Sequence, residues 1–105
     1  MGGIKLMIEI TTVEEFEDFI NQDKHVVVDF YAKWCGPCKQ IKPLLERRYD
    51  DKIDIAKVDI DEFPTLVDKY GIMSVPKLFI FNGGDIVKEN QGNPLAFLKE
   101  INKFI

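Results

Sequence analysis

The two cysteines of the chain, Cys35 and Cys38, stand three residues apart in the segment WCGPC at residues 34–38. Thiols at positions i and i+3 lie on the same side of a helical turn, so they can close a small disulfide and reopen it. Pro37 suits the first turn of a helix, because its φ fits and its missing N–H is not needed there. Cys35 would then lie at a helix N-terminus, which favours a thiolate. An exposed thiol with a lowered pKa and a second thiol behind it indicates thiol–disulfide exchange.

Two other interpretations of the cysteine pair are open: two buried structural thiols, or half of a zinc site. Structural zinc needs four ligands, and His25 is the only histidine that could join the cysteines. The Cys and His ligands are therefore too few for a closed site within one chain, and no metal is expected.

The segment before the cysteines, residues 26–32, is apolar apart from Asp29 and is typical of a buried central strand. A carboxylate inside such a run costs free energy unless it is neutral, paired or functional. Asp29 therefore either points from the strand into solvent or is a buried acid with a functional role. The segment after the cysteines predicts a helix that runs to about Tyr49 and is kinked at Pro43.

Hydrophobic periodicity, capping residues and turn residues predict the remaining elements in the order βαβαβαββα. The other strands are expected at 4–10, 53–58, 78–81 and 86–89, and the other helices at 13–20, 64–70 and from 94 to the C-terminus. The expected capping residues are Thr12, Asp61 and Asn93 at the helix starts and Gly71 at the end of the helix at 64–70. The apolar positions of these elements, which include Ile8, Val13, Leu95 and Ile105, are expected to face the core. Parallel strands need right-handed crossovers, whereas the final hairpin adds antiparallel strands. The fold class is therefore α/β, a central mixed sheet with helices on both faces, and residues 1–105 form a single domain.

The composition is ordinary for a soluble globular protein, with 46% hydrophobic and 30% charged residues. The net charge of −4 and the lack of a basic stripe argue against nucleic acid as a partner. No apolar run is long enough to span a membrane. Residues 4–10 alternate apolar and charged side chains and do not form the apolar core of a secretory signal. We therefore expect a cytoplasmic protein that is a monomer and does not bind membranes.

Residues 28–39, VDFYAKWCGPCK, closely resemble the active-site segment of the thioredoxin family. Similar residues recur along nearly the whole chain: Pro43, KVD at 57–59, YGI at 70–72, VP at 75–76 and the GG turn at 83–84. The resemblance implies the thioredoxin fold and a protein-disulfide reductase that carries electrons and maintains cell redox homeostasis. It implies no bound cofactor besides the cysteine pair itself, and it implies recycling by a thioredoxin reductase, typically an NADPH-dependent flavoprotein.

The same resemblance implies roles for individual residues. Cys35 would be the nucleophile and Cys38 the resolving thiol, and together they would form the redox disulfide. Asp29 would be the proton acceptor, with Lys57 close enough to tune it. The residues that shape the site and bind disulfide-containing protein substrates would be Gly36, Pro37, Trp34, Val75, Pro76 (in a cis peptide bond, packed against the disulfide) and Gly92.

Two residues depart from the family pattern at the expected substrate groove. Lys77 replaces the usual threonine and is expected to add a positive charge there, and Asn93 makes the contact surface less apolar. Two alternative functions also remain: a disulfide isomerase or oxidase, and a thioredoxin-like subunit that binds a partner without turnover. Gly36 and Pro37 between the cysteines and the absent signal argue against the first alternative.

Overall fold

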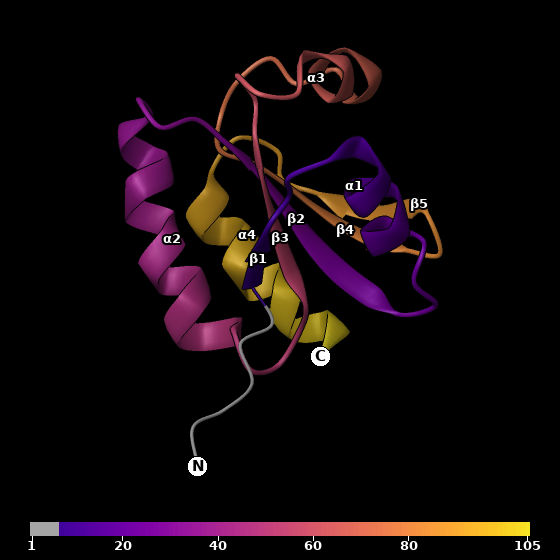
Figure 1. The fold of residues 1–105 in the computed structure, drawn as a ribbon. Coiled ribbons are helices and arrows are strands. Elements are labelled where there is room, and N and C mark those ends of the chain that lie inside the picture. Colours follow the sequence, from indigo (N-terminus) through magenta and orange to yellow (C-terminus); the bar gives the residue numbers. More distant parts are fainter. Residues whose placement is uncertain (1–6) are drawn as a thin grey trace.

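The computed structural model describes residues 7–105, and within them the chain forms five strands and four α-helices (Figure 1). The elements are β1 (Met7–Glu9), α1 (Val13–Ile20), β2 (His25–Tyr31), α2 (Gly36–Tyr49), β3 (Ile55–Asp59), α3 (Pro64–Tyr70), β4 (Lys77–Asn82), β5 (Asp85–Glu89) and α4 (Pro94–Ile101), followed by a 3₁₀ turn at Asn102–Phe104. The predicted order βαβαβαββα is confirmed. Residues 4–6 of the predicted first strand lie outside the described residues.

The five strands form one mixed sheet in the order β1-β3-β2-β4-β5. β3 pairs in parallel with β1 and β2, whereas β4 pairs antiparallel with both β2 and β5. β2 is thus the central strand. Because α2 follows it directly, the cysteine segment lies at the carboxyl end of the central strand, the usual place for a site in an open α/β sheet.

Successive side chains of β2 point to opposite faces of the sheet, and each face has its own apolar core. Val28 and Phe30 pack in one core with residues of α1 and α3. Val27 packs in the other core with residues of α2 and α4. Asp29 stands two residues after Val27 and therefore lies on the α2 and α4 face of the sheet.

Three of the four predicted capping residues lie at the helix ends where they were expected. Thr12 caps α1 by accepting the N–H of Glu15, Asn93 caps α4 by accepting the N–H of Leu95, and Gly71 ends α3 at a φ of 61°. Asp61, expected to cap α3, does not do so. The N-cap residue there is Phe63, and Asp61 instead directs its carboxylate to Trp34.

Four apolar residues expected on buried faces are substantially exposed: Ile8, Val13, Leu95 and Ile105, at 39, 40, 53 and 57%. Ile8 lies on β1, an edge strand with a neighbour on one side only. Val13 and Leu95 lie in the first turns of their helices. Periodicity identifies the side of an element that faces the core, but it does not show how much of that side the neighbouring elements bury.

Candidate active site

The cysteine pair lies where the chain leaves β2 and enters α2. Cys35 is the N-cap residue of α2, and its Sγ accepts the backbone N–H of Cys38 at 3.1 Å. Pro37 stands in the first turn, as its sequence position predicted. The two cysteines are joined in a disulfide, with their Cα atoms 5.3 Å apart. The sulfur of Cys35 therefore occupies a position that would stabilise a thiolate. A thiolate there would accept a hydrogen bond and would face the positive end of the helix dipole.

Both cysteines are almost fully covered in this disulfide form, each with 4% of its surface exposed. They pack with Ala32 against Tyr31, Ile60 and Val75. The expectation that Cys35 is an exposed thiol is therefore wrong for the oxidised protein. The reason is that the chain segment carrying Val75 comes close to the cysteines, which a reading of the cysteine segment alone does not reveal.

The segment around Val75 forms one wall beside the disulfide. The Val75–Pro76 peptide bond is cis, and the Val75 carbonyl oxygen lies 3.7 Å from Cys35 Sγ, within reach of a thiol donor. Trp34 flanks Cys35 in the chain and is 68% exposed, with its Nε1–H donated to Asp61 at 3.0 Å. Met73, which the sequence analysis did not single out, is 96% exposed two residues before Val75. Apolar side chains are therefore available next to the sulfurs.

Asp29 is fully buried, and neither of its carboxylate oxygens has a hydrogen-bond partner in the described protein. Burial raises the pKa of Asp29 from 3.8 to about 7, because a charged carboxylate loses its hydration there. Lys57 acts in the opposite direction, and Glu9 adds a smaller upward contribution. Of the two interpretations that the sequence left open for Asp29, the structure excludes the solvent-facing one.

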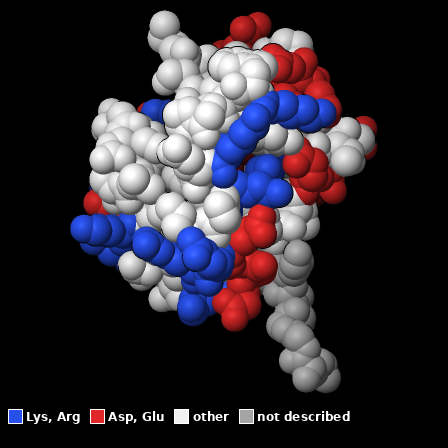
Figure 2. Space-filling view, turned by 90° about the vertical axis from the view of Figure 1, so that its left-hand side faces the viewer, with Lys and Arg blue, Asp and Glu red and all other residues white. Residues whose placement is uncertain are grey.

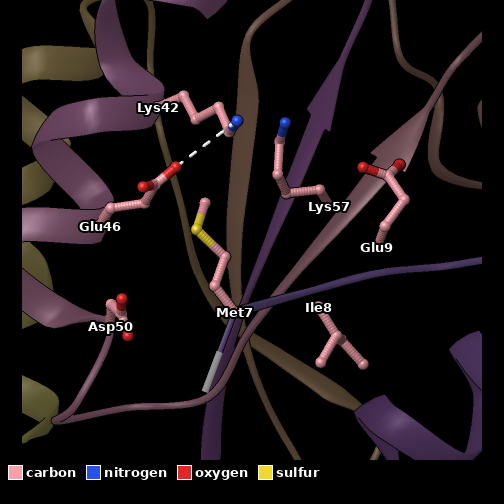
Figure 3. A pocket seen from close by; sticks show the side chains of 7 residues that line it. All are labelled: Met7, Ile8, Glu9, Lys42, Glu46, Asp50 and Lys57. Carbon is pink, nitrogen blue, oxygen red and sulfur yellow. Dashed lines mark ion pairs between the residues drawn. The ribbon is translucent and has the colours of Figure 1, made fainter. Parts of the chain in front are cut away.

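Lys57 stands directly opposite Asp29 in the pairing of β2 and β3. Its amino group lies 3.9 Å from the centroid of the Tyr31 ring. Lys57 also lines a cleft of about 230 Å³ between the β1 edge of the sheet and α2, shown from close by in Figure 3. Solvent can therefore approach the side chains next to Asp29 through this cleft, although Asp29 itself is buried.

Comparison with known proteins agrees with this geometry. The family model described as thioredoxin matches residues 7–105. The chain belongs to the thioredoxin family. Among curated relatives, a thioredoxin of Streptomyces clavuligerus is 44% identical over 84% of this chain and 82% of that protein. Thioredoxin-1 of Saccharomyces cerevisiae is 39% identical over 91% of this chain and 96% of its own.

Solved thioredoxin structures share the fold. That of Malassezia sympodialis thioredoxin superposes with a TM-score of 0.88 at 30% identity, covering 99% of this chain and 95% of that one. The expected fold class, a mixed sheet with helices on both faces, is confirmed. As a thioredoxin with its cysteine pair at disulfide distance, the protein is a thiol–disulfide oxidoreductase that acts on disulfide substrates.

Lys77, one of the two departures from the thioredoxin pattern, does not present a free charge beside the site. Its Nζ donates to Glu89 at 3.0 Å and to the Asn90 carbonyl at 2.8 Å. Asn90 in turn is buried, accepts the N–H of Leu78 and donates to the carbonyl of Gly92. The ion pair with Glu89 offsets the positive charge that was expected at the substrate groove, and Lys77 instead helps to hold the loop that carries Gly92.

The zinc interpretation has no counterpart in residues 7–105, which hold no cluster of three or more His, Cys, Asp or Glu side chains suited to a metal ion. His25 is the first residue of β2, at the opposite end of that strand from the cysteines, with its ring against Phe104. Among the helices of residues 7–105, none is long and apolar enough to cross a membrane.

Proposed function

We propose that this thioredoxin works as a reductase of protein disulfides. The Cys35 thiolate attacks one sulfur of a substrate disulfide and releases the other sulfur as a thiolate. Cys38 then loses its proton and attacks Cys35 Sγ, which releases the second substrate sulfur. The substrate disulfide gains two electrons and two protons, and the Cys35–Cys38 dithiol becomes the disulfide that the structure contains.

The observation that supports this assignment of roles best is the position of Cys35 Sγ at the N-cap of α2. A thiolate there accepts the N–H of Cys38 and faces the positive end of the helix dipole. Both effects lower the pKa of the Cys35 thiol and raise the fraction of nucleophile at neutral pH. Cys38 lies inside the first turn, where its own sulfur has no such position, and it therefore acts second.

We further propose that Asp29 accepts the proton of Cys38. Asp29 lies on the sheet face that α2 covers, and a general base works best when its pKa is near the working pH. The pKa of about 7 that burial gives Asp29 meets this condition. Lys57 moderates that value from the neighbouring strand, since its positive charge favours the carboxylate.

The substrate would dock as an extended segment over the surface next to the sulfurs. Val75, Pro76 and Trp34 supply its apolar contacts, and Gly92, at a φ of 95°, leaves the neighbouring loop without a side chain. Gly36 and Pro37 set the turn that separates the two cysteines. In the space-filling view of the side that carries α2, basic and acidic side chains are interspersed, which favours protein partners over nucleic acid (Figure 2).

Reducing equivalents would come from NADPH through a thioredoxin reductase. A relative from Mycobacterium leprae, 34% identical over 93% of this chain, is named a bifunctional thioredoxin reductase/thioredoxin, which supports this partner. We place the protein in the cytoplasm, where reduced thiols persist and where it would maintain redox homeostasis. The exposed large apolar side chains of the described residues are scattered over several elements, which supports a monomer formed as one domain of residues 1–105.

Alkylation tests the assignment of the two thiols. With limiting iodoacetamide near neutral pH, the fully reduced protein should be labelled at Cys35 in roughly tenfold or greater excess over Cys38, because the N-cap position stabilises only the Cys35 thiolate. Peptide mapping by mass spectrometry measures the ratio. The same reaction on protein unfolded in urea is the control, in which the two cysteines should react about equally. Preferential labelling of Cys38 in the folded protein would reverse the proposed roles.

A further inference from the structure

Three charged or titratable side chains stand side by side across three neighbouring strands. Glu9 of β1 pairs with Lys57 of β3, and Lys57 pairs with Asp29 of β2. Paired residues of neighbouring strands point to the same face of a sheet, so all three side chains lie on the α2 face. Tyr31 stands two residues beyond Asp29 on β2 and shares this face.

Direct contacts connect Glu9, Tyr31 and Lys57 beside Asp29, at the edge of the cleft. The Tyr31 hydroxyl donates to Glu9 Oε2 at 2.7 Å, and the Lys57 amino group lies over the Tyr31 ring. Burial and the hydrogen bond to Glu9 raise the pKa of Tyr31, so its hydroxyl stays protonated and remains the donor. Figure 3 shows Lys57 between Glu9 on one side and Lys42 of α2 on the other.

We propose that Glu9 and Tyr31 are positioning residues for the proton acceptor: their hydrogen bond fixes the ring that holds the Lys57 amino group, and so keeps that charge from pairing directly with Asp29. The proposal rests on the proposed function, because it assumes that Asp29 takes up the proton of Cys38. A direct ion pair with Lys57 would favour the carboxylate and make Asp29 a weaker base. An Asp29 kept apart from Lys57 remains suited to accept a proton near neutral pH.

Few other charged or titratable groups near Asp29 could change how readily it accepts a proton. On its own strand the neighbour on this face is Tyr31, and β3 and β1 contribute Lys57 and Glu9. β4 contributes the apolar Leu78 opposite Asp29, and α4 covers this face with apolar side chains. α2 contributes Lys42 and Glu46, and Asp50 follows the helix as its C-cap; all three line the cleft.

Glu46 supplies a matched control because it lines the same cleft but pairs with Lys42 on its own helix, at 3.6 Å. The experiment is a ¹³C NMR titration of the Asp29 carboxyl in the oxidised protein. In Glu9→Gln the midpoint should fall by about half a pH unit or more, because a nearby negative charge is lost and Lys57 is released toward Asp29. Tyr31→Phe should lower it less, and Glu46→Gln should leave it in place.

A double-mutant cycle separates positioning from the direct effect of the Glu9 charge. In a Lys57→Met background the released amino group no longer exists, so Glu9→Gln should shift the midpoint by less than half of its shift in the parent. An equal shift in both backgrounds, or a parent shift no larger than that of Glu46→Gln, overturns the proposal. The reduction rate of Asp29→Asn tests the proposed base independently: an unchanged rate contradicts that base, whereas the titration still decides whether Glu9 positions Lys57.

Discussion

A Cys38→Ser variant should react once with a protein disulfide and then stop as a mixed disulfide on Cys35. The resolving attack needs a second sulfur, and a serine hydroxyl does not supply one. Catalytic reduction of insulin should therefore fall on the order of a thousandfold or more, the scale of loss seen when a catalytic nucleophile is removed. A stoichiometric adduct should accumulate in its place.

Mass spectrometry of the trapped species, before and after treatment with dithiothreitol, measures this outcome. Cys35→Ser is the matched control, because it keeps one cysteine of the same pair but should form no adduct during the same incubation. Adducts on Cys38 in the Cys35→Ser variant, in an amount similar to those on Cys35 in Cys38→Ser, would contradict the order of the two attacks.

An Asp29→Asn variant should be more stable than the parent at pH 8 but slower in turnover. Burial raises the pKa of Asp29 to about 7 in the folded protein, whereas an unfolded aspartate titrates near its ordinary value of about 3.9. Between these two values the folded state binds more protons than the unfolded state. The free energy of unfolding of the parent therefore falls as the pH rises through this window, and above it the buried charge is a full cost.

The expected gain at pH 8 is about 1–3 kcal/mol, because a shift of three units corresponds to roughly 4 kcal/mol and a buried amide without partners loses part of that. At pH 4 the gain should vanish, since Asp29 is then neutral in the folded protein. Urea unfolding of the oxidised parent and variant at both pH values measures this. A gain that is the same at pH 4 and pH 8, or no gain at either, would show that Asp29 does not titrate as a buried acid.

The same substitution removes the proposed base for Cys38. When resolution limits the rate, turnover should fall roughly a hundredfold, a typical contribution of a general base. Leu78 is a suitable site for a control, because it lies opposite Asp29 on β4 and is equally buried. A Leu78→Met variant should alter packing beside Asp29 without slowing resolution, which separates loss of the base from general disturbance of this core.

Most of the fold could be predicted from the sequence because its signals are local. The apolar run of β2, the Thr12 and Asn93 caps, Gly71 at the end of α3 and the Gly83–Gly84 turn each act within a few residues. The position of Cys35 at the start of α2 was predictable for the same reason, since Pro37 marks the first turn. The order of the strands in the sheet was left open by these local signals, and the structure gives it as β1-β3-β2-β4-β5.

What the sequence did not reveal depends on contacts between distant segments. Glu9 and Tyr31 are 22 residues apart, and their hydrogen bond follows from strand pairing that only the fold defines. Likewise Asp61 was expected to cap a helix, whereas it binds the Trp34 ring nitrogen from another element. The cover over Cys35 by the Val75 segment is a third case, because 40 residues separate them. All three contacts depend on the register of paired strands or on which loops come close together in the fold.

The central claim is that this thioredoxin is a reductase and not an oxidase or isomerase. The most direct test of that claim is the reduction potential of the Cys35–Cys38 disulfide. Trp34 is the only tryptophan and is the residue before Cys35, so its fluorescence should report the redox state during equilibration with defined dithiothreitol buffers. A reductase of this family is expected to have a reduction potential of about −270 mV. A value above about −180 mV, in the range of disulfide isomerases and oxidases, would contradict the claim.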